Sequence, residues 1–158
     1  FASMTNPEEP GQDPDLGSIV APEELQAAIF QDEEVDSTDV SILLARSHQP
    51  KPDNKASRLK NLRLQLAHAM LNRRFERISR EKDSPVASAS SYKSSWFKAV
   101  DFGAVSVTAA DDRWQDVVRI LENEFRRVMK HGFSQSELNE VKSNVINSAQ
   151  QAVERKLS

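Results

Sequence analysis

The three histidines, His48, His68 and His131, are the only imidazoles in the sequence that could bind a metal or act as a base. None lies in an H-x-x-E-H or H-E-x-x-H pair, the spacing that turns two zinc-binding imidazoles toward the same ion. His68 falls within a helical pattern and is expected to be a helix-surface or packing residue. His131 precedes a glycine, where a cation favours a helix C-terminus. The sequence therefore predicts no metal ligand and no catalytic residue in this chain.

Other catalytic signatures are missing too. The four glycines are scattered, so there is no glycine-rich phosphate loop, and no G-x-S-x-G elbow is present. The absence of cysteine excludes disulfides and thiolate metal sites. Two adjacent carboxylate pairs, Glu33 with Glu34 and Asp111 with Asp112, are better explained by solvation and helix capping than by acid–base catalysis.

Charge is strongly segregated along the chain. Residues 1–45 contain eleven Asp and Glu and no Lys or Arg, whereas residues 55–82 contain nine Lys and Arg against two Glu. The basic segment could bind a nucleic-acid backbone or an anionic membrane surface, which makes an anion-binding module one candidate function. Aromatic residues are nearly absent from it, however, so we favour a simpler interpretation in which acidic and basic faces meet within one polypeptide.

Length and composition fit one globular domain. The 158 residues are 38% hydrophobic and 28% charged, and no apolar run approaches the length of a membrane span. Residues 1–20 are rich in proline, glycine and acid, and we expect them to form a linker from a preceding domain, with the domain itself covering residues 21–158. Since the chain starts at Phe1, we expect it to be part of a longer protein.

Strands are expected on both sides of a long helix. The apolar runs 25–30 and 39–47 predict two neighbouring strands, the second central in a sheet, and residues 83–100 and 101–110 predict an antiparallel pair that turns near Asp101. Between them, apolar residues at three- and four-residue spacing predict a helix from Lys55 to about Glu81, with Asp53 or Asn54 as its cap.

Two further helices are expected at the C-terminal end. Asp111 or Asp112 is expected to cap a helix that ends at Gly132, and the last helix is expected from about Gln135 towards Lys156. Ser134 and Glu137 have the spacing of a capping box. These elements predict an α+β fold with two layers, in which helices pack on one face of an antiparallel sheet.

Three short motifs carry a family resemblance. They are "MLNRRF" at residues 70–75, "DSP" at 83–85 and "GFSQSEL" at 132–138. In this order and spacing they resemble the insulinase or pitrilysin family of inverted-zincin zinc metallopeptidases, over about residues 20–156. The resemblance implies the metallopeptidase repeat domain of the mitochondrial-processing-peptidase type, here the copy without the zinc motif that follows the zinc domain.

The resemblance also implies a function. A noncatalytic domain of this kind would help to enclose the peptide-binding chamber of a zinc metalloendopeptidase and support the separate zinc domain. Its partners would be that zinc domain and the second half of the same polypeptide. The longer protein to which the chain would belong, called the parent below, would bind a peptide substrate. Neither nucleic-acid binding nor membrane insertion is expected. No cofactor is expected in this chain, and zinc is expected in the neighbouring domain. The parent is expected to be periplasmic or exported, although the sequence itself leaves the compartment open.

Arg80 is the one site residue that the resemblance suggests. The family shows an R-E-K segment followed by a tyrosine seven positions after the arginine, and both side chains hold substrate near zinc. Arg80, Glu81 and Lys82 match the segment, but the tyrosine position is Ala87, which weakens a substrate-binding role for Arg80. A cation in the last turn of its helix is the simpler explanation. A second candidate function is an inactive scaffold or assembly subunit with the same fold.

Overall fold

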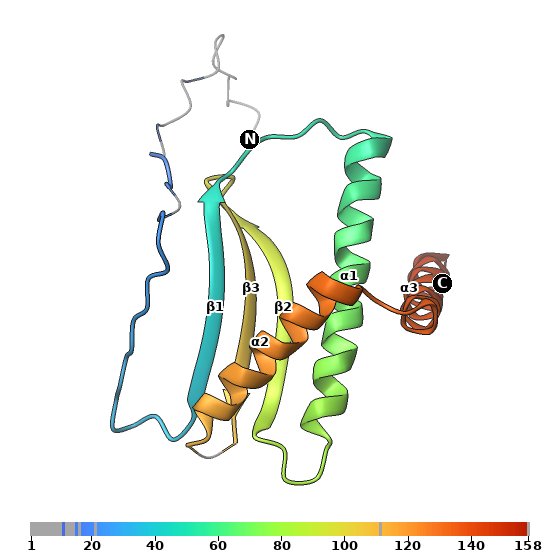
Figure 1. The fold of residues 1–158 in the computed structure, drawn as a ribbon. Helices are drawn as coiled ribbons and strands as arrows, with labels where there is room; N and C mark the ends of the chain where they lie inside the picture. The colour runs from blue at the N-terminus through green and yellow to red at the C-terminus, as the bar shows by residue number, and fades with distance from the viewer. Residues whose placement is uncertain (1–10, 12–14, 16, 21, 111, 158) are drawn as a thin grey trace.

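A three-stranded antiparallel sheet and three helices make up the computed structural model, which describes residues 11, 15, 17–20, 22–110 and 112–157 (Figure 1). The element order is β1 (Thr38–Ser47), α1 (Lys55–Ser79), β2 (Val86–Trp96), β3 (Val100–Ala109), α2 (Trp114–His131) and α3 (Gln135–Leu157). The strand order is β1-β3-β2, so β3 is central and β1 and β2 each leave one edge free of strands. The predicted α+β class is confirmed.

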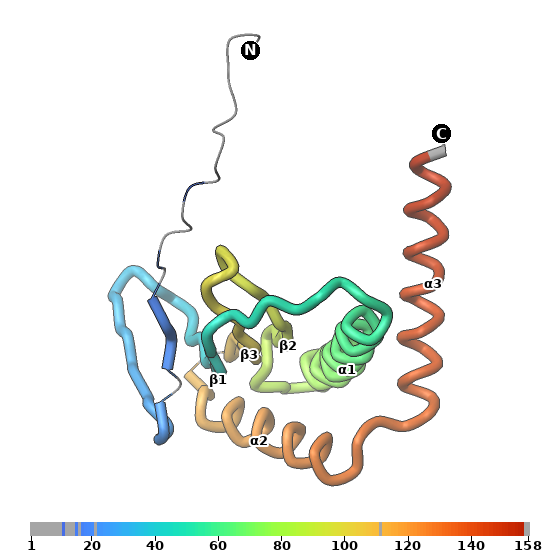
Figure 2. The backbone as a smooth tube through the Cα atoms, turned by 90° about the horizontal axis from the view of Figure 1, so that it is seen from above, coloured from blue at the N-terminus to red at the C-terminus, as the bar shows by residue number. Residues whose placement is uncertain are grey.

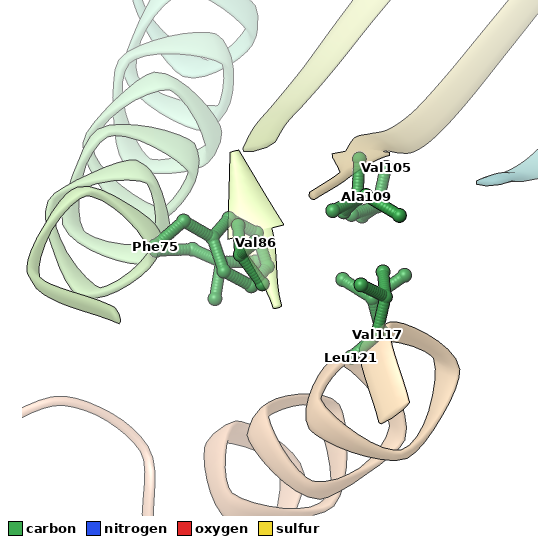
Figure 3. Packing of buried hydrophobic residues seen from close by; sticks show 8 residues of the cluster. Phe75, Val86, Val105, Ala109, Val117 and Leu121 are labelled. Carbon is green, nitrogen blue, oxygen red and sulfur yellow. The ribbon is translucent and has the colours of Figure 1, made fainter. Parts of the chain in front are cut away.

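The core lies between one face of the sheet and the helices α1 and α2. Alternate residues of β3 point into it, namely Val105, Val107 and Ala109, which confirms the predicted two-residue periodicity. Leu121 of α2 lies below Val105 and Ala109, and Phe75 of α1 lies to their side next to Val86 (Figure 3). Burying two such side chains contributes roughly 1.5–3 kcal/mol each. Among the described residues, no helix covers the opposite face of the sheet (Figures 1 and 2).

α1 begins and ends close to its predicted bounds. Asn54 is the N-cap, and its side-chain oxygen accepts a hydrogen bond from the Ser57 backbone N–H at 2.9 Å. The apolar residues at three- and four-residue spacing along α1 are buried only in its second half. Leu59 and Leu62 each remain about two-fifths exposed, whereas Met70 and Phe75 are buried. The sheet and the other helices therefore meet α1 mainly along its C-terminal half.

The junction between α2 and α3 forms as predicted. Gly132 ends α2 with a φ of 66°, a value that favours glycine, and its N–H donates to the Val128 carbonyl at 2.8 Å. The capping box is closed in both directions. The Ser134 N–H donates to the Glu137 carboxylate at 2.7 Å, and the Glu137 N–H donates to the Ser134 hydroxyl at 3.3 Å. α3 then leaves the junction and runs across α1 (Figure 2).

Two predictions about elements are wrong. Residues 25–30 form no strand, because in the described structure they make no sheet pairing, and Leu25 and Phe30 are both 93% exposed. β1 is an edge strand rather than a central one, so Leu43 and Leu44 lie largely in solvent. The hairpin between β2 and β3 forms as predicted, with its turn at residues 97–99, close to Asp101, which itself pairs with Arg46 inside the sheet.

The start of α2 differs from its prediction as well. Its N-cap is Arg113, with no side-chain capping bond, so Asp112 lies one position too early to cap. The Arg113 guanidinium is held instead by the backbone carbonyls of Asp83 and Ser84. Asp111, the other predicted cap, lies outside the described residues, as does most of the predicted linker 1–20.

Candidate functional site: a free strand edge beside helix α1

The three histidines lie in separate parts of the fold. His48 follows β1 and its Nδ1 lies 2.8 Å from Asp101 Oδ1, whereas His68 of α1 lies with its Nδ1 2.7 Å from the Ser91 hydroxyl. Partial burial, and then the nearby charge of Lys93, lower the pKa of His68. His131 is the last residue of α2. Within the described part of the chain, no group of three or more His, Cys, Asp or Glu is arranged to hold a metal ion, so these residues do not fit a zinc site.

His48, Asp101 and Ser95 have the residue types of a hydrolase triad but not its geometry. The hydroxyl of Ser95 and the imidazole of His48 both bond to the same oxygen of Asp101. These two hydrogen bonds, Ser95 first, lower the pKa of Asp101 to about 2. Because Ser95 donates to the carboxylate rather than to the imidazole, no base activates it as a nucleophile. The cluster ties the loop after β1 to the end of the hairpin.

A groove of about 510 Å³ runs between α1 and the free edge of β2. Its volume falls within the range of ordinary ligand sites. The residues that line it are Asn61, Leu64, Gln65, His68, Ala69 and Asn72 of α1 and Ser91, Tyr92, Lys93, Ser94 and Ser95 of β2. Figure 1 shows α1 standing beside this edge along the length of the strand. The groove thus combines mostly polar side chains with strand backbone.

Asn72 occupies one end of the free edge. Its Oδ1 accepts a hydrogen bond from the Ser91 N–H at 2.6 Å, and its Nδ2 donates to the Ser91 carbonyl at 3.1 Å. A neighbouring strand would make the same two bonds with a residue on this edge. Ser91 must therefore point its backbone groups away from β3. The groove does not extend to Ala89, whose side chain packs against the core, so the part of the edge that faces the groove runs from Ser91 towards Ser95.

The backbone of Lys93 and Ser95 faces the groove. In an antiparallel pair, every second residue turns its N–H and C=O to the same side, and the register of β2 against β3 is unbroken from Ser88 to Trp96. Lys93 and Ser95 therefore share the outward direction of Ser91. In the described structure no other strand lies on this edge. Two N–H and two C=O groups are thus available for a chain that enters the groove.

Aromatic side chains border the same edge on the helix-free face of the sheet. Tyr92 and Trp96 of β2 flank Phe102 of β3, with ring centroids 6.1 and 4.5 Å from the Phe102 ring in edge-to-face arrangements. Phe102 is buried beneath them, whereas Tyr92 and Trp96 remain 40% and 58% exposed. Between the two exposed rings, Ser94 is the residue of β2 that points to the same face.

Cations of the C-terminal half of α1 are largely paired. Arg73 and Arg77 bond Glu140 of α3, and Arg74 bonds Glu137 at 2.6 Å. These partners come from α3 rather than from the acidic start of the chain. The structure therefore gives these arginines intramolecular roles, in line with the simpler interpretation of the charge pattern.

A second groove, of about 480 Å³, lies at the start of α1. Asp53, Asn54, Lys55, Arg58, Leu59 and Leu62 line it. All six residues come from the first turns of one helix and its cap, and Asp53 bonds Arg58 across them. It offers no strand edge, so the groove beside β2 is the better candidate site.

Comparison with known proteins decides the family. A sequence model described as the peptidase M16 inactive domain matches residues 3–145. The chain belongs to this family. A search of curated protein sequences found no match.

Two solved structures are similar to this M16 inactive domain. One is the periplasmic protease PqqL from Escherichia coli, with a TM-score of 0.70 and 21% identity over 79% of this chain. The other is the first half of the same protease, with a TM-score of 0.64 and 22% identity over 78% of this chain. The chain covers only 14% of the whole PqqL chain and 26% of its first half. At this identity the likeness shows the fold.

Arg80 is not part of the groove. It is the C-cap residue of α1, mostly exposed, and its guanidinium bonds Glu76 one turn earlier. Ala87, at the position of the family tyrosine, lies in the first residues of β2. The groove residues Asn72, Lys93 and Ser95 were not singled out from the sequence. The "MLN" of the 70–75 motif was the available signal for Asn72, but only the strand order reveals that β2 has a free edge.

Proposed function

We propose that this M16 inactive domain is the noncatalytic domain of a zinc metalloendopeptidase, where it helps to enclose the peptide-binding chamber and supports the separate zinc domain. The observation that carries the proposal is the free edge of β2 beside the groove of about 510 Å³. Unpaired strand backbone is the surface to which an extended peptide adds in β-augmentation. The domain would thus contact substrate without performing chemistry on it.

The chemistry would come from elsewhere in the parent. Zinc held by a neighbouring domain would activate a water molecule for attack on the peptide bond, and this chain would contribute no ligand. Its partners would be that zinc domain and the second half of the same polypeptide, reached through a linker at residues 1–20 that precedes a domain at 21–158. Neither nucleic-acid binding nor membrane insertion forms part of the proposal. Arg80, exposed at the end of α1, stays a candidate for substrate binding.

A periplasmic or exported parent is part of the proposal. The family and the periplasmic PqqL, similar in fold, support it. Among the described residues, no helix is long and apolar enough to cross a membrane.

A scaffold or assembly subunit with the same fold is the alternative function. The preceding domain of the parent distinguishes the two, because an H-x-x-E-H motif there implies a peptidase and its loss implies a scaffold. An anion-binding module is less well supported, because Arg73, Arg74 and Arg77 of the basic helix are engaged by glutamates.

Cleavage of a quenched, unstructured peptide by the parent polypeptide and by this chain alone tests the proposal. We expect the parent to cut the peptide, chelator to abolish the activity and added zinc to restore it, while the 158-residue chain alone is inert. Chelator-sensitive cleavage by the chain alone would overturn the noncatalytic assignment. A folded parent that cuts nothing would instead support the scaffold.

A further inference from the structure

Asn72 sets the limit of the free edge of β2. Its side-chain amide satisfies both backbone groups of Ser91, at 2.6 and 3.1 Å, so an incoming chain finds that position already paired. The next outward-facing residues, Lys93 and Ser95, are the ones left open. The Asn72 side chain thus takes the place of a neighbouring strand at Ser91 and leaves the backbone groups of Lys93 and Ser95 open.

The same geometry sorts the side chains of an incoming strand. A residue that pairs with Lys93 or Ser95 would direct its side chain toward α1, where Gln65, His68 and the Lys93 ammonium are polar. The residue between them would lie opposite Ser94, on the other face. There it would meet the exposed rings of Tyr92 and Trp96, which suit an apolar or aromatic partner.

We propose that Asn72 is a register stop, a positioning residue that restricts a bound peptide to pairing with Lys93 and Ser95 and so places an apolar residue opposite Ser94. The inference rests on the proposed function and deepens it. It names the ligand class as an extended segment with the pattern polar, apolar, polar. If the bound peptide shifted by one residue along β2, its apolar side chain would turn toward the polar side chains of α1. A fixed register therefore also selects which peptide sequences bind.

Amide hydrogen exchange of the 158-residue chain, read by NMR, tests the register one residue at a time. The probe is a capped seven-residue peptide with phenylalanine at its centre and serine and glutamine elsewhere, so that its end can reach Ser91 while the phenylalanine lies opposite Ser94. In the wild type we expect saturating peptide to slow exchange of the Lys93 and Ser95 amides at least tenfold. The Ser91 amide should exchange slowly with and without peptide, because Asn72 already holds it.

The variant Asn72→Ala removes the stop. Its Ser91 amide should exchange fast without peptide and at least tenfold more slowly with peptide, because the strand can now extend to that position. If peptide slows Lys93 and Ser95 but not Ser91 in this variant, the register stop is wrong while peptide binding stands. If peptide slows none of the three amides in the wild type, the proposed binding edge itself fails.

Two controls accompany the variant. A peptide with serine in place of the central phenylalanine should bind at least fivefold more weakly, and equal binding would contradict the apolar position. Should Asn72→Ala fail to fold, Asn72→Asp keeps an acceptor for the Ser91 N–H but removes the donor to the Ser91 carbonyl. Peptide should then shift the Ser91 carbonyl carbon resonance in Asn72→Asp and not in the wild type. The same shift in both proteins, or in neither, would overturn the stop.

Discussion

Arg74 is the residue that joins all three helices. From α1 it bonds Glu137 of α3 at 2.6 Å, contacts Glu124 of α2 at 3.5 Å and donates to the Gly132 carbonyl at 3.1 Å. Its guanidinium also lies over the Phe133 ring, 4.8 Å from the centroid. The side chains of Arg74, Glu124 and Glu137 are all largely buried. A buried, multiply bonded cation holds the α2–α3 junction against α1.

Replacing Arg74 with methionine should therefore destabilise the domain strongly. Loss of one partner leaves Glu137 buried without its counter-charge, which costs about 3 kcal/mol. The matched control is Arg73→Met, because Arg73 is adjacent but 43% exposed in its side chain and pairs with Glu76 and Glu140 at the surface. We expect less than about 1 kcal/mol from that change. Urea unfolding measures both, and equal effects would contradict the special role of Arg74.

The same contact predicts a loss of stability in acid. Hydrogen bonding to Arg74, opposed by burial and aided by Ser134, lowers the pKa of Glu137 to about 2. The folded pKa lies below the ordinary value of 4.5, so the contribution of Glu137 is complete above about pH 5 and is lost as the pH falls towards 2.

Unfolding at pH 7 and pH 3 should show this in the wild type and in Glu137→Gln. The variant should be less stable at pH 7 but lose less stability between the two pH values, because its side chain does not titrate. Asp101, whose pKa is also about 2, remains in both proteins and serves as the common background. If both proteins lost the same free energy of unfolding between pH 7 and pH 3, titration of Glu137 would not explain the loss of stability in acid.

Elements whose signals are local were predictable from the sequence. The caps at Asn54 and Ser134, the end of α2 at Gly132 and the alternation in β3 depend on neighbours within a few residues, and the structure confirms each. Strand 25–30 failed because apolar residues give a strand only where a partner edge accepts them. β1 could not be identified as an edge from its own apolar run, since strand order is a tertiary property.

The candidate groove could not be predicted from the sequence. The histidines considered in the sequence lie in separate parts of the fold, with His48 beside Asp101 and His68 beside Ser91. The groove arises where α1 stands beside β2, and its key contact joins Asn72 to Ser91, 19 positions along the chain. Neither residue type marks such a contact, so the pair requires the folded arrangement to be recognised.

For the molecule as a whole, stability should depend little on the far half of α3. Val141 is the buried apolar residue of this helix, whereas residues 147–156 are exposed throughout, and α3 extends past α1 (Figure 2). Deleting residues 147–158 should therefore remove helical signal from circular dichroism but change the free energy of unfolding by less than about 1 kcal/mol, as expected for surface positions.

The matched control for this deletion is Val141→Ala, which leaves a cavity beneath the same helix and should cost about 1–2 kcal/mol. Urea unfolding of both variants makes the comparison direct. If the deletion cost more than Val141→Ala, the far half of α3 would have to contribute to the fold despite its exposure. If the order is as expected, the fold is held by the sheet, α1, α2 and the first turns of α3, and the projecting half of α3 adds little to its stability.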